Sequence, residues 1–244
     1  MKSIIVCEGG TDLALIQYFM EKANNWIYKD NKKEISYFKD SKNFKKENDR
    51  LTIASAGGCS KIPKCFEGVI EKNRYSTLEE EKFDNIIIIS DRDEIDTLDD
   101  FEKSIKSAFI NNDIEIEDIN IDNNEWVSIT CLNGRQTNIN FRVLLLIIPF
   151  EETGAIETFL LNAISVNDIY DKEIIEKSNL FVDDIDQEGR YIKKRRHKTK
   201  AKFDVYFSVR TPLEQFVERR NILKSIPWEE YEEIQTSFKK LNEL

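Results

Sequence analysis

Short apolar segments of strand length recur along the first 150 residues of the chain, and polar turns separate them. The segments are continuous rather than alternating, which is typical of strands that are buried on both faces in a parallel sheet. The last segment follows an Asn133-Gly134 turn, so it is predicted to pair with the strand before it as a local antiparallel hairpin. The predicted strands are Ser3–Cys7, Leu51–Ala54, Ile86–Ile89, Glu125–Leu132 and Arg142–Ile148.

Apolar residues at helical spacing follow most of these strands. Leu13, Ile16 and Met20, for example, recur at intervals of three or four positions and form one face of an amphipathic helix. Alternating strands and helices are typical of an α/β fold, so we expect a Rossmann-like, mostly parallel central sheet flanked by helices. Further helices are predicted at Lys61–Arg74, Thr97–Asn111, Glu151–Ile164, Asp168–Asn179, Phe203–Arg210 and Trp228–Leu241.

A change in composition after Val166 divides the chain into two parts. Residues 1–165 are predicted to form the α/β core. Residues 24–50 within it are polar and rich in Asn and Lys, so we expect an insertion or a long loop there rather than a core element. Residues 166–244 are predicted to form a mostly helical C-terminal extension that packs on the core and carries a basic segment at residues 193–200.

The charge and the cysteine pattern limit the partners of the chain. The net charge is −10, which argues against nucleic-acid binding through overall charge, although residues 193–200 hold six Lys or Arg in eight positions. No apolar run is long enough to cross a membrane, and the first residues lack a signal-peptide pattern. Four cysteines without a CxxC pair and a single histidine do not form a zinc-site pattern. We therefore expect a cytoplasmic protein that has no membrane partner.

Two aspartates follow the Ile86–Ile89 strand. Asp91 and Asp93 are two positions apart, so on an extended chain their carboxylates point to the same side. The carboxyl end of the strands in an open α/β sheet is where ligands bind. Adjacent carboxylates repel each other, and a divalent cation that takes oxygen ligands relieves this repulsion. The alternative interpretation is a solvated acidic turn.

Other acids are predicted at the same edge of the sheet. Glu8 follows the first strand, where a solvated loop acid is the alternative. Asp12 lies in the first turn of the next helix, where it could act only as a helix cap. Glu157 lies near the start of the helix after the last strand, where a surface acid that favours the helix dipole is the alternative. Together these positions predict a crevice lined by carboxylates.

Two features are candidate contacts for phosphate groups. Gly57 and Gly58 lie between a strand and a helix start, with Lys61 close behind, and helix N-terminal amides in such a turn can face a phosphate. A plain connecting turn is the alternative there. The basic segment is the second feature, and a solvated charge run is its alternative. Its candidate nucleic-acid-binding residues are Lys193, Lys194, Arg195, Arg196 and Lys198.

The order of these motifs resembles a TOPRIM domain, the catalytic module of topoisomerases, primases and several nucleases. The resemblance rests on Glu8-Gly9 after the first strand and Asp91-Arg92-Asp93 after a later strand, and it covers roughly residues 1–165. Asp12, the Gly57-Gly58 turn and Gly154-x-x-Glu157 resemble a narrower group. This group is the TOPRIM nucleases of the overcoming-lysogenization-defect (OLD) type and their small stand-alone relatives, several of which act in defence against phages.

The resemblance implies a metal-dependent nuclease that hydrolyses phosphodiester bonds in DNA or RNA. It implies that catalysis uses Glu8, Asp91, Asp93 and a late lysine, for which Lys200 is the best match and Lys198 the next. The implied ligands of Mg²⁺ or Mn²⁺ are Glu8, Asp12, Asp91, Asp93 and Glu157.

The chain also departs from the family pattern. It has no ATPase motif, so the ATPase that usually accompanies these nucleases would be a separate partner, as would any other component of a defence system. No topoisomerase tyrosine motif or primase zinc ribbon is visible. A homo-oligomer is a further option. Two other functions stay open: a non-catalytic or partner-activated TOPRIM-like protein that binds nucleic acid or a nucleotide, and a phosphotransfer protein of the receiver or phosphatase type.

Overall fold

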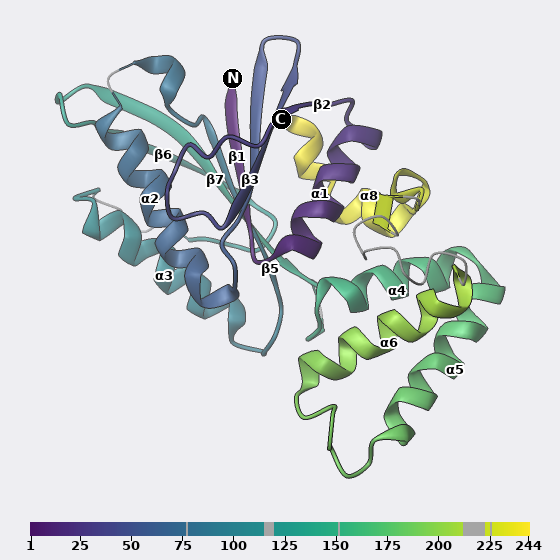
Figure 1. Cartoon of the computed structure of the whole chain (residues 1–244). Coiled ribbons are helices and arrows are strands. Elements are labelled where there is room, and N and C mark those ends of the chain that lie inside the picture. The colour runs from purple at the N-terminus through teal and green to yellow at the C-terminus, as the bar shows by residue number, and fades with distance from the viewer. Residues whose placement is uncertain (77, 115–119, 151, 212–222, 225) are drawn as a thin grey trace.

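The structure is a computed structural model that describes residues 1–76, 78–114, 120–150, 152–211, 223–224 and 226–244. Within these ranges, seven strands form one sheet in the order β2-β3-β4-β1-β5-β7-β6, and helices cover both of its faces (Figure 1). The strands are β1 (Lys2–Cys7), β2 (Ile27–Asp30), β3 (Asp40–Lys46), β4 (Asp49–Ser55), β5 (Asn85–Asp91), β6 (Trp126–Leu132) and β7 (Asn138–Ile148). The α-helices are α1 (Gly10–Ala23), α2 (Ile62–Tyr75), α3 (Thr97–Asn111), α4 (Ile156–Asn167), α5 (Ile169–Ile185), α6 (Arg195–Arg210) and α8 (Glu232–Ser237). The 3-10 helices are η1 (Cys59–Lys61), η2 (Glu79–Glu81), η4 (Trp228–Glu230) and η5 (Lys239–Glu243).

The central strands of the sheet are parallel and its edges are antiparallel. β1 lies between β4 and β5, β7 pairs with β5, and all three of these pairs are parallel. β6 pairs with β7 in the antiparallel sense, which confirms the predicted hairpin. β3 pairs with β4, and β2 with β3, in the same antiparallel sense. The fold is therefore mixed α/β, with a mostly parallel sheet flanked by helices, and the parallel strands all end at one edge.

Side chains of β5 alternate between two cores, as strand geometry requires. Ile87 and Ile89 belong to the core that the sheet forms with α1, α4 and α6, whereas Ile86 and Ile88 belong to the core formed with α2 and α3. All four side chains are buried. The run of isoleucines is continuous because each face of this strand is covered.

Residues 24–50 add two strands to the sheet, whereas the sequence pattern predicted an insertion or a long loop. β2 and β3 lie in this range, and Trp26, Phe38 and Phe44 are buried. The strands are hard to recognise because few of their side chains are buried, and β2 lies at the edge of the sheet, where one side of the ladder faces water. In β3, only Ser41 and Phe44 are buried, so the segment lacks an apolar run.

The end of the chain completes the core beside α1. Trp228 and Phe238 are fully buried. The ring of Phe238 lies 5.1 Å from that of Phe19 in α1 and 6.0 Å from that of Phe159 in α4. The predicted helix over Trp228–Leu241 is broken into η4, α8 and η5. None of the described helices is both long and apolar enough to span a membrane.

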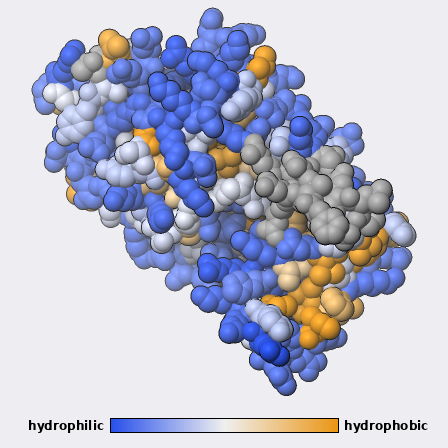
Figure 2. Space-filling view, in the orientation of Figure 1, coloured by the Kyte–Doolittle hydropathy of each residue, from blue (hydrophilic) through white to orange (hydrophobic). Residues whose placement is uncertain are grey.

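Helices α5 and α6 form an arm that packs on α4 and extends beyond the sheet (Figure 1). α6 begins at Arg195 rather than at Phe203, so most of the basic segment is helical. The helix was predicted too short because its first turns are exposed and charged and therefore carry no apolar periodicity. Figure 2 shows apolar surface on this side of the molecule, and Leu180, Phe181 and Ile185 of α5 are exposed apolar residues.

We expect Phe238→Ala to lower the free energy of unfolding by about 3–5 kcal/mol, because it leaves a cavity between α1 and α4. Urea unfolding followed by circular dichroism measures this change. Leu180→Ala is the control, because Leu180 is 65% exposed and its truncation should cost less than about 0.5 kcal/mol. Equal losses in the two variants would contradict the packing described for the end of the chain.

Candidate active site

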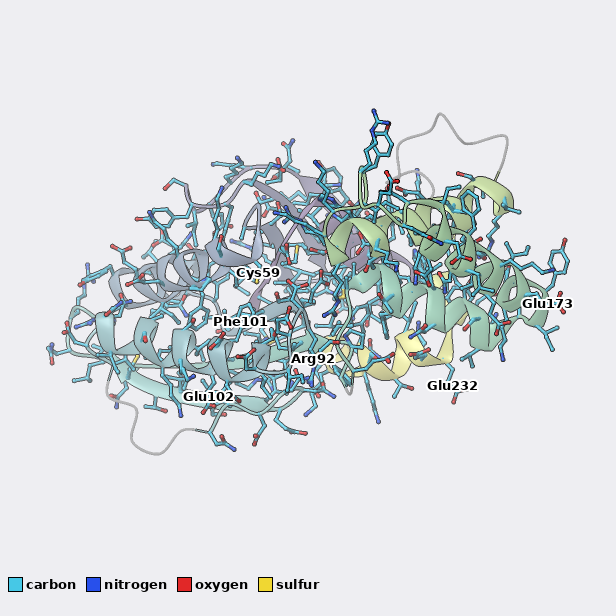
Figure 3. The ribbon with its side chains drawn as sticks, turned by 90° about the horizontal axis from the view of Figure 1, so that it is seen from below. Cys59, Arg92, Phe101, Glu102, Glu173 and Glu232 are labelled. Carbon is cyan, nitrogen blue, oxygen red and sulfur yellow. The ribbon has the colours of Figure 1, made fainter. Side chains whose placement is uncertain are left out.

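Carboxylates gather where the neighbouring parallel strands β1 and β5 end. Glu8 follows β1 directly, and Asp91 is the last residue of β5. The first turns of α1 and α4 add Asp12 and Glu157. Figure 3 looks onto this edge of the sheet, with α2 and α3 on one side and α4 and α6 on the other. The pairing of β1 with β5 is what brings side chains more than 80 positions apart in the sequence to one place.

Two of the aspartates also hold the starts of helices. Asp12 Oδ2 accepts a hydrogen bond from the backbone N–H of Gly9, the N-cap residue of α1, at 2.7 Å. Asp91 Oδ1 accepts one from the first residue of α4, Ile156, at 2.8 Å. Helix N-terminal amides favour a negative charge, so these bonds offset part of the cost of burying the carboxylates. Each of these bonds uses one oxygen of the carboxylate.

Burial and mutual repulsion raise the pKa values of these acids. Burial raises the pKa of Asp12 to about 7, and the charges of Glu157 and Glu8 add to the increase. Burial also raises the pKa of Asp91 well above its usual value, with further contributions from Asp12, Glu8 and Glu157. The pKa of Glu8 is raised first by burial and then by Asp93, which itself is exposed. The structure thus brings together all five acids that the sequence singled out.

Lys200, an exposed residue of α6, is the candidate lysine whose charge acts on the carboxylates. Its positive charge lowers the pKa of Glu8 and of Asp12, against the effect of burial. Lys198, the other candidate, instead forms an ion pair with Asp183 of α5 at 2.8 Å. Both lysines lie on α6 and are two positions apart, so their side chains leave the helix in nearly opposite directions.

The donor set fits a divalent cation. Carboxylate oxygens are the ligands that Mg²⁺ prefers in proteins. Glu8 Oε2 is buried and has no hydrogen-bond partner among the described residues, so an electropositive ligand would satisfy it. Within the same residues, no three His, Cys, Asp or Glu side chains are already arranged to hold an ion. Side chains of the cluster would therefore have to turn toward a cation that enters.

The Gly57-Gly58 turn fixes the backbone at Glu8. The N–H groups of Gly57 and Gly58 donate to the carbonyl oxygen of Glu8 at 2.9 and 3.0 Å, so these two amides have a partner within the fold, and the predicted contact of this turn with a phosphate stays a prediction. Their φ angles of +82° and +137° favour glycine. Lys61 is exposed at the end of η1 and stays a candidate phosphate contact.

The basic segment contacts the loop after β5. Lys193 and Lys194 precede α6, and Arg195 is its first residue. Arg195 Nη1 donates a hydrogen bond to the backbone carbonyl of Asp93 at 2.7 Å. Arg195 therefore has a structural contact besides its predicted role in nucleic-acid binding, whereas Arg196 is exposed at the start of the helix.

Sequence reasoning missed Cys59 and Ser90, which lie beside the carboxylates. A backbone hydrogen bond from Cys59 lowers the pKa of Glu8, which stabilises its charged form. The Sγ atom of Cys59 lies 3.7 Å from Oγ of Ser90, in β5. Figure 3 labels Cys59 and Arg92 in the region between the two groups of helices. The position of Cys59, directly after the glycine pair, is the signal that could have found it.

In metal-free buffer, we expect Asp12→Asn to raise the melting temperature by a few degrees at pH 8. The pKa of Asp12 rises from 3.8 to about 7 in the folded protein, so this group favours folding at low pH and loses that contribution as the pH rises through about 7. Asparagine removes the charge and can still accept the bond from Gly9. The benefit should shrink as the pH falls toward 5, which thermal unfolding in EDTA at both pH values would measure.

Asp99→Asn is the matched control for this measurement, because Asp99 is an exposed acid in the first turn of α3. Its replacement should not raise the melting temperature at either pH, since an acid there favours the helix dipole. A lower melting temperature for Asp12→Asn at pH 8 would contradict the repulsion inferred for the carboxylate cluster.

We compared the sequence and the structure with those of known proteins. No curated protein matches the chain. A comparison with solved structures gives the crystal structure of hypothetical protein PH0156 from Pyrococcus horikoshii OT3, with 16% sequence identity and a TM-score of 0.49, over 91% of this chain and 96% of the other. The model of the family described as "Protein of unknown function (DUF3226)" matches residues 2–241. Because this match spans nearly the whole chain, the protein belongs to the DUF3226 family.

Proposed function

We propose that the protein is a metal-dependent TOPRIM nuclease that hydrolyses phosphodiester bonds in DNA or RNA. The observation that carries this proposal is the gathering of carboxylates at the ends of β1 and β5, with Lys200 facing them. Burying like charges together costs free energy, so a fold retains such a cluster where a cation or a reaction uses it. The proposed ligands of Mg²⁺ or Mn²⁺ are Glu8, Asp12, Asp91, Asp93 and Glu157.

Each part of the cluster has a chemical role in this proposal. A bound Mg²⁺ or Mn²⁺ supplies Lewis acidity toward the phosphate and lowers the pKa of a water molecule. Glu8, whose pKa is raised, is the candidate general acid or base. Lys200 stabilises the negative charge that develops on the phosphate oxygens. Asp91 is a proposed metal ligand, and the N–H of Ile156 fixes one of its oxygens.

The basic residues around the crevice would hold the substrate. Lys193 and Lys194 precede α6, Arg196 lies in its first turn, and Lys61 ends η1. Cations at this place attract the phosphate backbone although the chain as a whole carries a charge of −10. Contacts of this kind do not select a base sequence.

A partner-activated or non-catalytic form is the second candidate function. The observation that favours it is that, among the described residues, no three acids are already arranged around an ion. A separate ATPase or a component of a defence system would then complete the site, and the role of the protein in phage defence would depend on that partner. The resemblance to nucleases of the overcoming-lysogenization-defect type supports this option.

We expect millimolar Mg²⁺ or Mn²⁺ to raise the melting temperature of the wild-type protein at pH 8, because a cation that binds the folded state relieves the repulsion. Asp91→Asn should lose most of this increase while it keeps the hydrogen bond to Ile156. Thermal unfolding in EDTA and in each metal measures both effects, with Asp99→Asn as the control that keeps the full increase. Equal increases for wild type and Asp91→Asn would place the cation elsewhere.

We further expect cleavage of at least one substrate among plasmid DNA, single-stranded DNA and tRNA, in Mg²⁺ or Mn²⁺ but not in EDTA. Asp91→Asn and Lys200→Ala should each reduce the rate by about 100-fold or more, because each removes a group that stabilises the transition state. Circular dichroism shows whether the variants are folded. Wild-type protein that cleaves none of these substrates would overturn the proposed nuclease in favour of the binding protein, and a pull-down would then search for the partner.

A further inference from the structure

We propose that Asp183 is a positioning residue that sets the rotation of α6 about its axis, so that Lys200 faces the carboxylate cluster. The inference rests on the proposed function, in which Lys200 acts on the substrate phosphate. It assigns a task in the site to α5, an element that contributes none of the proposed ligands.

Asp183 binds the two lysines that flank Lys200. Lys198 and Lys202 approach Asp183 Oδ1 at 2.8 and 2.9 Å, and Lys202 also reaches Oδ2 at 3.1 Å. The hydrogen bonds from Lys198 and Lys202 lower the pKa of Asp183, so it is charged at neutral pH. One carboxylate of α5 thus holds two cations of α6.

Because α6 is a regular helix, these contacts determine the direction in which the side chain of Lys200 leaves it. Lys198 and Lys202 are four positions apart and share one face of α6. Lys200 lies midway between them, which is roughly 200° of rotation from each at 3.6 residues per turn. A contact that draws the outer two lysines toward α5 therefore directs the middle one away from α5. The hydrogen bond from Arg195 to the carbonyl oxygen of Asp93 holds the start of α6 beside the acids, and the charge of Lys200 lowers the pKa values of Glu8 and Asp12.

Two other contacts fix the ends of this part of α6. Arg195 donates to the carbonyl oxygen of Asp93 at 2.7 Å, next to the site. Phe203 and Phe207 are buried in the core beside α1 and α4. Between these anchors, the ion pairs with Asp183 tie the exposed turns of the helix to α5.

These ion pairs should affect the rate of reaction more than the stability. The side chains of Lys198, Lys202 and Asp183 are 44%, 25% and 37% exposed, and exposed ion pairs contribute little to folding. A misplacement of about 1 Å in a catalytic group, in contrast, can cost about 100-fold in rate. The function of the contact is therefore to orient Lys200.

A double-mutant cycle on metal-dependent cleavage by the full chain tests the proposal. Asp183→Asn should lower kcat by about 10- to 100-fold and leave KM nearly unchanged. In a Lys200→Ala background the same change should have almost no further effect, because Asp183 acts through Lys200. Asp183→Glu should restore most of the activity, and Asp184→Asn, which alters the adjacent exposed acid, should leave it unchanged. Equal losses in both backgrounds would show a merely structural role and overturn the proposal.

A second measurement tests the ion pairs of Asp183 and does not depend on cleavage activity. The metal-free protein is treated with the N-hydroxysuccinimide ester of acetic acid, and mass spectrometry follows the acetylation of Lys198, Lys200 and Lys202. In folded Asp183→Asn, all three lysines should react faster, because Lys198 and Lys202 lose their partner and Lys200 moves away from the carboxylates.

The two measurements separate the inference from the proposed function. Wild-type protein without nuclease activity, but with faster acetylation of Lys200 in Asp183→Asn, would overturn the proposed function and support the positioning of Lys200 by Asp183. Unchanged acetylation of Lys200 in the folded variant would overturn the positioning, whatever the activity of the wild type.

Discussion

Electrostatic repulsion among carboxylates at one edge of the sheet is the constraint on which the site depends. β1 and β5 are neighbours, and the side chains on both of their faces are buried. This packing holds the backbone at Glu8 and Asp91 in place, so the two acids stay close together. Two helix starts offset part of the resulting cost, since Gly9 and Ile156 donate backbone hydrogen bonds to Asp12 and Asp91. Burial, together with the repulsion that remains after these bonds, raises the pKa values of Asp12 and Asp91, and a cation or the charge of Lys200 can reduce this repulsion further.

The C-terminal part of the chain belongs to the site as much as the parallel sheet does. The charge of Lys200, on α6, lowers the pKa of Glu8, and Arg195 ties the start of this helix to the loop that carries Asp93. The same part of the chain also packs on the helices that carry two of the acids. Phe238 packs against α1 and α4, the two helices whose first turns hold Asp12 and Glu157. The end of the chain therefore packs on the two helices, α1 and α4, that carry Asp12 and Glu157.

The sequence predicts those features of the fold that arise from the pattern of buried residues within one segment. The run Ile86–Ile89 predicts a central strand, and Asp91 and Asp93 predict carboxylates at the end of that strand, because local patterns determine both. Features that depend on distant partners stay hidden. β2 and β3, in residues 24–50, bury few side chains. The first turns of α6 bury no side chain, so they show no apolar residues at helical spacing. Asp183 carries no motif at all, because its partners become neighbours only when α5 and α6 pack together.

The acids and the lysine of the site depend on different parts of the fold. Strand pairing and two helix starts place the carboxylates, so their mutual repulsion, and with it any affinity for a cation, is a property of the sheet and its first helices. Lys200 lies on α6, which the buried Phe203 and Phe207 anchor in the core, and we propose that the exposed ion pairs with α5 set the direction of Lys200. Exposed ion pairs weaken with salt, whereas a buried sheet does not respond to it. In the proposed function, cation binding and phosphate chemistry would therefore depend on different parts of the fold, because a change in the arm that displaces Lys200 leaves the carboxylates where the sheet holds them.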